Sequence, residues 1–299
     1  MRPFLPVVAI LALVISACGG GGAPSGMPTI RIGSTNFSEQ LIVGELYAQV
    51  LEANGYKIER KFNLGAREVV VPALESGQID LEVDYLATLL AFLDKTATGS
   101  TDAATTARTL DEKLKAKNLV QFDFAPAVDQ NGIVVTKDTA TRLNLKKISD
   151  LAPVAKDLTF GGPPECPNRE FCAQGLEKVY GIKFKTFRPL DVGGPLTVTA
   201  LEGKQIDVAL LFTSDAVIAV KGFVLLEDDK KLQLSDNIVP IVRKDLADKG
   251  GSDLRNRVND VSKKLTTAEL TELNKQVGVD KRDPKDVARD WLKKQGLIK

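Results

Sequence analysis

The stretch ALESGQID, residues 73–80, occurs again in modified form as ALEGKQID at residues 200–207. The two octapeptides are identical at six of eight positions and begin 127 residues apart. Upstream of them, NGYKI at residues 54–58 has a counterpart in YGIKF at residues 180–184. A separation this long lies far outside the roughly 20–50 residues of solenoid repeats. The sequence therefore predicts two similar lobes.

Around the first copy, apolar residues alternate between the two-residue period of strands and the wider spacing of helices. The strand pattern covers residues 29–33, 57–62 and 79–85. The helical pattern covers residues 41–50 and 69–76. Strands that alternate with helices are typical of a parallel, doubly wound sheet. We therefore expect an α/β fold in which each lobe is built as strand, helix, strand, helix, strand.

Extending the alignment of the two copies by five residues places Tyr85 opposite Phe212. Both aromatic residues end a predicted buried strand, which is the edge at which open α/β sheets bind ligands. Polar residues follow each ring: Thr88 after the first, Thr213 and Asp215 after the second. Two interpretations stay open. Each ring packs in the core of its own lobe, or the two rings close on a ligand from both sides.

The N-terminal segment is a mostly apolar run that ends in ISAC, residues 15–18, followed by four glycines. The run is too short to span a bilayer comfortably and lacks a stop-transfer flank, so it predicts an export signal. Residues 1–18 resemble a bacterial lipoprotein signal, in which Cys18 becomes the first mature residue and carries lipid. Residues 19–28 would then be a flexible tether. An ordinary secretory signal with an incidental cysteine is the alternative.

The stretch GGPPECPNREFC, residues 161–172, contains Cys166 and Cys172, which suit a metal site, a redox pair or a structural clip. Export would place both cysteines in an oxidising environment. Zinc needs further ligands, yet the chain has no histidine and only Cys18 as another cysteine. We therefore expect a disulfide that stabilises the fold by about 2–3 kcal/mol and fixes the presentation of Arg169.

The charges of the chain almost cancel, with 40 basic and 39 acidic residues. No basic block or aromatic-interleaved basic patch appears, so we expect no nucleic-acid partner. The absence of histidine, and of any cysteine outside the expected pair and Cys18, counts against most acid–base and nucleophilic chemistry and leaves carboxylates and lysines for it. We expect neither an enzyme nor a cofactor or metal site.

A series of motifs is distributed along residues 29–299. They are IGSTNFSEQ at 32–40, DYLAT at 84–88, PNR at 167–169, DV at 207–208 leading to TSD at 213–215, LEDDK at 226–230 and DPKDVA at 283–288. In this order they resemble the glycine betaine/choline-binding proteins of ABC importers, a family of osmoprotectant-binding lipoproteins. The resemblance implies a two-lobe, type II periplasmic-binding-protein fold of the α/β class, with a ligand cleft between the lobes. Lobe I would comprise residues 29–128 plus 222–299, and lobe II residues 129–221.

The resemblance also implies a site in which aromatic faces surround a quaternary ammonium. Such a group cannot donate a hydrogen bond, so it is recognised by cation–π attraction and apolar contact, at most about 2 kcal/mol per desolvated ring. Tyr85 would be a wall of this cage, and Thr88 and Arg169 would hold a carboxylate or another polar tail. The expected ligand-binding residues are Asn36, Phe37, Gln40, Tyr85, Thr88, Asn131, Arg169, Phe212, Thr213 and Asp215.

The chain departs from the family pattern at Thr35 and at two of these expected positions. Thr35 stands where family members often carry a lysine, and Asn131 stands where a second cage tyrosine usually follows the first crossing. Phe212 replaces a tyrosine but keeps the ring. The expected cage therefore shrinks to Tyr85, Phe212 and Phe37, which widens the range of ligands toward less cationic, more polar solutes.

The resemblance implies an extracytoplasmic solute-binding protein that captures a quaternary-ammonium osmoprotectant, such as glycine betaine or choline, and delivers it to ABC permease subunits. We expect a monomer in the bacterial cell envelope, held on the outer face of the cytoplasmic membrane by lipid on Cys18. One alternative keeps the transporter role for a non-quaternary, hydroxylated or aromatic solute. The others are a surface receptor that signals without transport and an enzyme on the same architecture.

Overall fold

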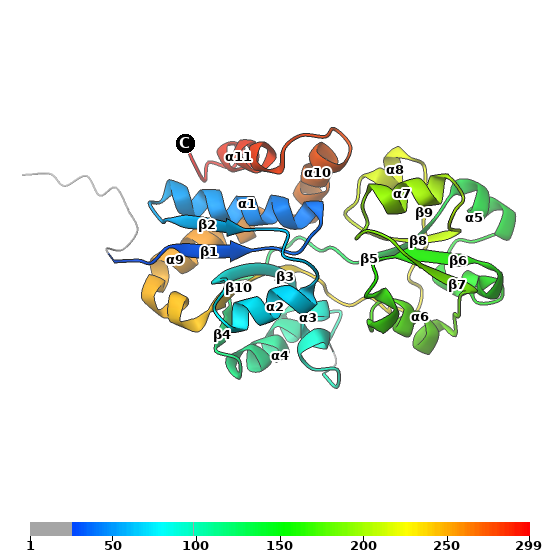
Figure 1. Ribbon diagram of the computed structural model, residues 1–299, viewed down its shortest axis with the longest axis horizontal. Coiled ribbons are helices and arrows are strands. Elements are labelled where there is room, and N and C mark those ends of the chain that lie inside the picture. The colour runs from blue at the N-terminus through cyan, green and yellow to red at the C-terminus, as the bar shows by residue number, and fades with distance from the viewer. Residues whose placement is uncertain (1–25, 98) are drawn as a thin grey trace, which may run out of the picture.

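The computed structural model describes residues 26–97 and 99–299. The expected export signal, Cys18 and the tether up to residue 25 lie outside the described residues. The described chain forms two lobes, each built around its own five-stranded sheet (Figure 1).

Lobe I contains a sheet with the strand order β2-β1-β3-β10-β4. Its strands are β1 (Ile30–Gly33), β2 (Ile58–Lys61), β3 (Leu81–Tyr85), β4 (Leu119–Gln121) and β10 (Ile238–Arg243). Its helices are α1 (Ser38–Ala53), α2 (Arg67–Glu75), α3 (Leu86–Leu93), α4 (Ala103–Lys115), α9 (Lys244–Lys264), α10 (Thr267–Gly278) and α11 (Pro284–Lys294). One apolar cluster joins the sheet to α1, α9, α10 and α11, and another joins it to α2, α3 and α4, so helices cover both faces.

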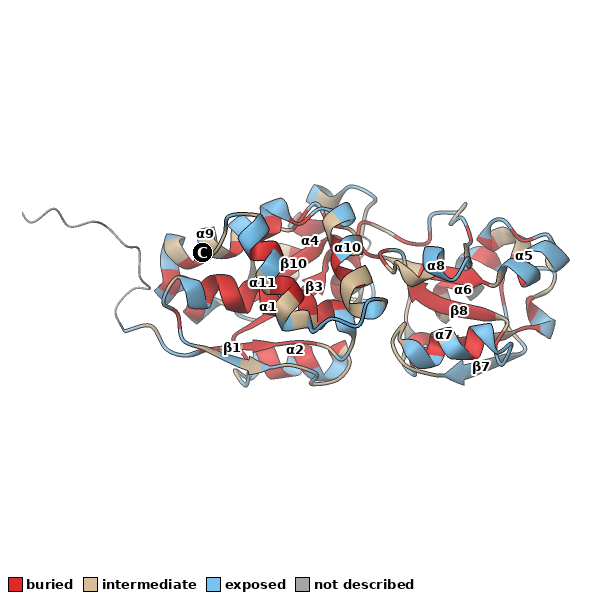
Figure 2. Ribbon diagram, turned by 90° about the horizontal axis from the view of Figure 1, so that it is seen from above, coloured by how far each residue is buried: buried red, intermediate tan, exposed pale blue. Residues whose placement is uncertain are grey.

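Lobe II contains a sheet with the strand order β7-β6-β8-β5-β9. Its strands are β5 (Asn131–Val135), β6 (Thr159–Gly162), β7 (Thr186–Pro189), β8 (Val208–Phe212) and β9 (Val224–Leu225). Its helices are α5 (Lys137–Leu143), α6 (Ala173–Tyr180), α7 (Pro195–Glu202) and α8 (Val217–Val220), with short 3-10 turns at Ile148–Leu151, Ala155–Asp157 and Cys166–Asn168. Buried residues form a separate core in each lobe (Figure 2).

The first three strands of the two lobes have the same parallel arrangement, β2-β1-β3 in lobe I and β7-β6-β8 in lobe II. This confirms the two-lobe α/β fold. The sheets are nevertheless mixed and not wholly parallel, because the fourth strand of each, β10 or β5, pairs antiparallel. Each of these strands enters its sheet directly from a crossing between the lobes, and that entry sets its direction.

The repeated sequence performs the same structural task in both lobes. Ile79 packs against Gly33 of the first strand in lobe I, and its counterpart Ile206 packs against Gly161 in lobe II. A Cβ added at Gly33 would lie 2.3 Å from the Cδ1 of Ile79, and one added at Gly161 would lie 2.6 Å from the Cδ1 of Ile206. The aspartate that follows binds the same strand. Asp80 accepts a hydrogen bond from the backbone N–H of Arg31 at 2.9 Å, and the Asp207 carboxylate accepts one from Thr159 at 2.9 Å. The motif therefore joins the third strand of each lobe to the first.

The two crossings run side by side between the lobes. The first passes from Ala127 to Asn131, and the second leads from Leu232 back to Ile238. They are joined by an antiparallel bridge between Val128 and Asn237.

The expected boundary of lobe II at residue 221 is wrong. Strand β9 pairs with β5, and Leu226 and Leu232 lie in the core of lobe II, so the chain returns to lobe I only after Leu232. Within the described part of the chain, no helix combines the length and apolar character needed to cross a membrane.

We expect Gly33→Ala and Gly161→Ala each to lower the free energy of unfolding by about 1–3 kcal/mol, because the added methyl group overpacks a buried isoleucine. Urea unfolding measures this directly. Gly278→Ala is the control, since nothing lies within 4 Å of its added Cβ. An unchanged stability in both core variants would contradict the role assigned to the repeat.

Candidate functional site

A cavity of about 450 Å³ lies between the lobes. Lobe I contributes the loop after β1, the start of α2, and the end of β3 with the start of α3. Lobe II contributes the start of β5, the end of β8 and the loop that follows the first cysteine. Its walls are therefore largely the carboxyl ends of parallel strands, which is where open α/β sheets bind ligands.

The structure brings most of the sequence-predicted site residues to this cavity. Those that line it are Asn36, Phe37, Gln40, Tyr85, Thr88, Asn131, Arg169 and Phe212. Thr213 and Asp215 are not part of the lining. The Thr213 hydroxyl accepts a hydrogen bond from the backbone of Gln130 at 2.9 Å, and the Asp215 carboxylate accepts one from the backbone of Phe212 at 2.9 Å. Both residues therefore hold the turn that follows β8.

Three aromatic rings are arranged in series across the cavity. Phe37 stacks on Phe212 with ring centroids 5.0 Å apart and on Tyr85 at 6.5 Å. Phe37 and Tyr85 belong to lobe I and Phe212 belongs to lobe II, so the stacking of Phe37 on Phe212 joins the lobes. Such stacking adds about 0.5–1.5 kcal/mol to the apolar burial of a ring pair. Tyr85 packs in the core of lobe I and Phe212 packs against the core of lobe II, and both rings also line the cavity.

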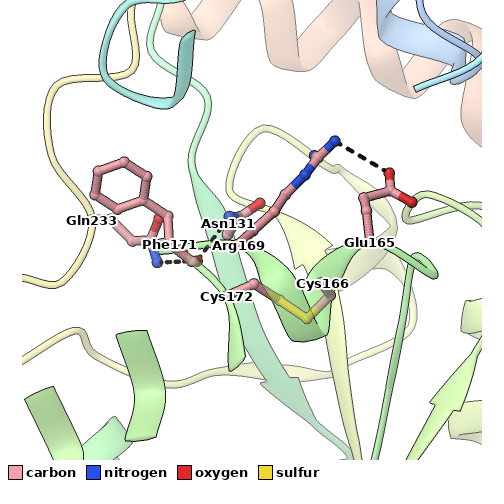
Figure 3. Close-up of a disulfide and its surroundings, with 7 residues drawn as sticks. All are labelled: Asn131, Glu165, Cys166, Arg169, Phe171, Cys172 and Gln233. Atoms are coloured by element: carbon pink, nitrogen blue, oxygen red, sulfur yellow. Dashed lines mark hydrogen bonds and ion pairs between the residues drawn. A yellow bond between two sulfur atoms is a disulfide. The ribbon is translucent and has the colours of Figure 1, made fainter. Parts of the chain in front are cut away.

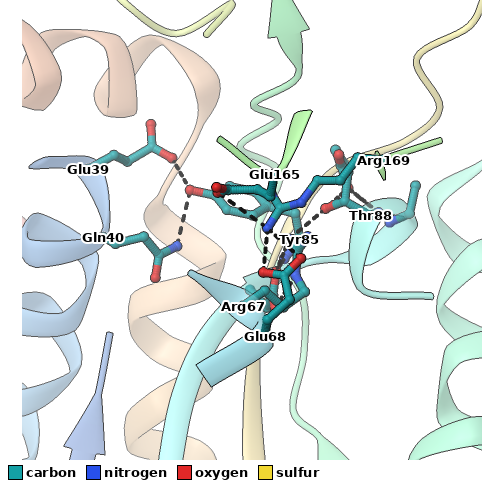
Figure 4. Close-up of polar contacts among 11 residues, drawn as sticks. Glu39, Gln40, Arg67, Glu68, Tyr85, Thr88, Glu165 and Arg169 are labelled. Atoms are coloured by element: carbon teal, nitrogen blue, oxygen red, sulfur yellow. Dashed lines mark hydrogen bonds and ion pairs between the residues drawn. The ribbon is translucent and has the colours of Figure 1, made fainter. Parts of the chain in front are cut away.

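The hydroxyl of Tyr85 is held by two side chains of α1 (Figure 4). It donates to the Glu39 carboxylate at 2.5 Å and accepts from the Gln40 amide at 3.1 Å. The other oxygen of Glu39 accepts from Ser214 at 2.8 Å and from Asn274 at 2.6 Å. Ser214 belongs to lobe II, so one buried carboxylate connects both lobes to a wall of the cavity.

Glu39 lies beside the crossings with two other acidic residues, of which Asp129 is also buried and Asp215 is half-buried. Burial raises the pKa of Glu39, an effect that its hydrogen bonds with Tyr85, Asn274 and Ser214 partly offset. The pKa of Asp129 is raised well above its usual value by burial and then by the charges of Glu39 and Asp215. Burial also raises the pKa of Asp215, to about 7. Each of these three carboxyl groups therefore binds its proton more tightly than it would in an exposed position.

A second polar network lies on the lobe I side, around Arg67. Its guanidinium donates to Asp84, with the closest contact at 2.6 Å, and to the Thr88 hydroxyl at 2.8 Å. Burial alone would lower the pKa of Arg67, but the charge and hydrogen bonds of Asp84 outweigh it and raise the pKa. Asp236 accepts from the backbone N–H groups of Ala87 and Thr88, both at 2.9 Å, and so caps the start of α3.

The predicted disulfide between Cys166 and Cys172 is present, with Cα atoms 5.3 Å apart (Figure 3). The loop that it closes is also held from outside, because the backbone oxygen of Phe171 accepts from Asn131 at 2.9 Å and from Gln233 at 3.0 Å. Asn131, expected to contact ligand, therefore uses its amide nitrogen to support this loop.

The disulfide loop directs Arg169 across the cavity toward lobe I (Figure 4). Its Nη2 donates to Glu68 Oε2 at 2.8 Å and to Oε1 at 3.2 Å, and it lies 3.5 Å from Glu165 on its own loop. Arg169 thus already has a carboxylate partner, supplied by the protein.

Glu39, Arg67 and Glu68 also belong to the site and were not predicted from the sequence. A signal existed for Arg67, because the buried strand LEVDY contains Asp84, and a charge in an apolar strand requires a partner. The other two are the second residues of their helices, where a glutamate is common in the first turn.

The chain is similar to substrate-binding proteins of transport systems, both in a family model and in individual relatives. Residues 28–294 match a family described as the substrate-binding domain of the ABC-type glycine betaine transport system. The carnitine transport binding protein OpuCC of Listeria monocytogenes is 29% identical over 310 residues, which cover 99% of this chain and 98% of that protein.

Two further similarities concern a larger protein and a solved structure. The ergothioneine transport permease/ergothioneine binding protein EgtU of Helicobacter pylori is 28% identical over 262 residues, 87% of this chain and 46% of that protein. A crystal structure of a glycine betaine/carnitine/choline ABC transporter component has a TM-score of 0.70 and 28% identity, covering 90% of this chain and 100% of its own.

We expect simultaneous Cys166→Ser and Cys172→Ser substitution to lower the free energy of unfolding by about 2–3 kcal/mol, because the unfolded chain regains the freedom of a short loop. Denaturant unfolding of the oxidised protein and of the double variant measures the difference. The same two proteins under reducing conditions should be equally stable. A difference that persists after reduction would contradict this explanation.

We expect the stability of Asp215→Asn, relative to the unchanged protein, to rise with pH. The pKa of Asp215 is about 7 in the folded protein against a usual 3.8, so folding retains a proton that the unfolded chain releases. The stabilisation is complete below pH 3.8 and is lost as the pH rises to about 7. Between pH 5 and 8 the difference in free energy of unfolding between Asp215→Asn and the unchanged protein should change by roughly 2 kcal/mol in favour of the variant.

Urea unfolding at several pH values tests this expectation for Asp215. Asp138→Asn is the control, because that side chain is 79% exposed. A stability difference for Asp215→Asn that is the same at every pH would refute it.

Proposed function

This chain belongs to the family of substrate-binding domains of ABC-type glycine betaine transport systems, and we propose that its inter-lobe cavity captures a quaternary-ammonium solute. Proteins of this family are solute-binding components of ABC importers and not enzymes. They work outside the cytoplasm and pass their ligand to a permease. The expected ligand class includes choline, glycine betaine and carnitine.

The observation that carries this proposal is the series of rings formed by Tyr85, Phe37 and Phe212. A quaternary ammonium has no hydrogen to donate, so aromatic faces are the partners that retain it in a desolvated site. Phe37 lies directly against Phe212, with no room for a ligand between these two faces. A cation would enter beside Tyr85 and push the Phe37 ring away from Phe212, so that the rings enclose it from both lobes.

The hydrogen bonds behind Tyr85 favour this use of the ring. Because Glu39 and Gln40 fix its hydroxyl, the ring has little freedom to turn away from the cavity. A wall held in place before binding costs less conformational entropy when the ligand arrives. The cavity lining also carries more acidic than basic side chains, which favours a cationic ligand.

A second candidate keeps the transporter role and changes the ligand to a non-quaternary, hydroxylated or aromatic solute. It is favoured by the amide side chains of Asn131 and Gln130, which line the cavity at the start of lobe II and contribute no ring there.

We further propose that the protein is a monomer anchored by lipid on Cys18 to the outer face of the cytoplasmic membrane. The support is the sequence ISAC at residues 15–18, followed by a glycine run suited to a tether. Mass spectrometry of the protein extracted from its native membrane would detect the lipid. An unmodified N-terminus beginning elsewhere would contradict this anchor.

Calorimetric titration of the chain from residue 19 onward with choline, glycine betaine, proline betaine and carnitine tests the ligand class. We expect at least one to bind, and Tyr85→Ala to weaken it by about 30-fold or more, because a desolvated ring contributes about 2 kcal/mol. Tyr85→Phe keeps the ring and should retain most of the affinity.

Tyr56→Phe is the matched control for loss of a tyrosine hydroxyl outside the cavity, since Tyr56 bonds Asp253 in lobe I. The absence of heat with all four compounds would contradict the proposal of a quaternary-ammonium ligand. The second candidate, a hydroxylated or aromatic solute, would then be tested.

A further inference from the structure

The ion pair between Arg169 and Glu68 connects the two lobes across the cavity. Glu68 is the second residue of α2 in lobe I, and Arg169 follows the 3-10 turn inside the disulfide loop of lobe II. The two side chains are separated by 101 positions in the sequence and are joined by hydrogen bonds of 2.8 and 3.2 Å. Both line the cavity.

The pair is ionised and partly shielded from water. Its side chains are 29% exposed at Arg169 and 46% exposed at Glu68. Burial alone would raise the pKa of Glu68, but the hydrogen bond and charge of Arg169 outweigh it, so the pKa lies below its usual value. Glu68 is therefore a carboxylate at neutral pH, held on the guanidinium that faces the cavity.

We propose that Glu68 determines how well this site accepts a ligand with a carboxylate, because it occupies on Arg169 the place that the ligand's carboxylate would take. This inference rests on the proposed function. A betaine must displace Glu68 before it can pair with Arg169, so it exchanges one charged hydrogen bond for another. A ligand without a carboxylate leaves the pair intact, and the pair then helps to hold the lobes together over it.

Other basic groups of the cavity do not provide an equivalent partner. Arg67 already donates to both oxygens of Asp84 and to the Thr88 hydroxyl, in the polar network on the lobe I side of the cavity. Lys95 is exposed, where a carboxylate gains little from pairing. Arg169 is therefore the cavity-lining cation whose bond can be exchanged, and Glu68 is the group that a ligand must replace. The unchanged protein should consequently bind choline more tightly than glycine betaine.

The test compares dissociation constants for choline and glycine betaine in the unchanged protein and in Glu68→Gln. Releasing Arg169 should improve glycine betaine relative to choline by about three- to tenfold, the range expected for a partly exposed charged pair. Choline itself should bind equally or more weakly, because the contact between the lobes is lost.

Two further variants separate competition for Arg169 from a general loss of negative charge. Glu170→Gln removes a carboxylate from the same loop that bonds Lys178 and not Arg169, so it should leave the ratio of the two constants within about twofold. In an Arg169→Gln background, Glu68→Gln should no longer change the ratio, because the contested group is gone.

A second readout does not require a ligand. Spin labels on Lys115→Cys in lobe I and Lys183→Cys in lobe II report the distance between the lobes, and both lysines are well exposed. Glu68→Gln should lengthen or broaden this distance in the ligand-free protein, whereas Glu170→Gln should not.

The outcomes are distinguishable. Binding of both compounds with the same ratio in the unchanged protein and in Glu68→Gln overturns the inference while the proposed function stands. An equal change in the ratio for Glu68→Gln and Glu170→Gln also overturns it, since the effect would then be general electrostatics. If no variant binds either compound, the proposed ligand class fails and the inference fails with it.

Discussion

The buried carboxylate of Glu39 is the interaction on which the arrangement of the two lobes and the site depends. It is 3% exposed and accepts hydrogen bonds from Tyr85, Ser214 and Asn274, which come from a strand end, the turn after β8 and a C-terminal helix. Burying a carboxyl group is costly unless its hydrogen bonds are satisfied. The three donors meet that cost only when both lobes and α10 are in place together. The position of the Tyr85 ring is therefore coupled to the contact between the lobes.

Each lobe meets a simpler constraint before this contact can form. The repeated isoleucine packs on a glycine of the first strand, and the repeated aspartate accepts from the backbone of that strand. These contacts set the positions of the third strand, at whose end Tyr85 and Phe212 stand. The same contacts, repeated in both lobes, thus place one ring on each side of the cavity. Phe37 lies between Tyr85 and Phe212.

The sequence predicts those features that arise from short segments. The octapeptide repeat predicts two lobes, and the export signal together with the absence of histidine predicts the disulfide. The aligned strand ends bring Tyr85 and Phe212 into correspondence and leave open whether the rings face a ligand or their own cores, and in the structure both line the cavity. The pairing of Arg169 with Glu68 could not be predicted in this way, because it joins side chains that meet only when the lobes come together. The edge strand β9 was also missed, since two residues give no readable period.

The paired crossings give the molecule a mechanical property. Their bridge between Val128 and Asn237 is extended by backbone hydrogen bonds of 3.1 Å from Asp129 to Asp236 and from Ile238 to Ala127. Two strands bonded along their length act as one ribbon, which bends more readily than it shears. We therefore expect the lobes to separate mainly by rotation about this ribbon. Ser214, bonded directly to Asp129 in the ribbon, moves little in such a rotation. The contacts that span the cavity lie farther from the axis of this rotation, so they are the ones that must break when the lobes separate.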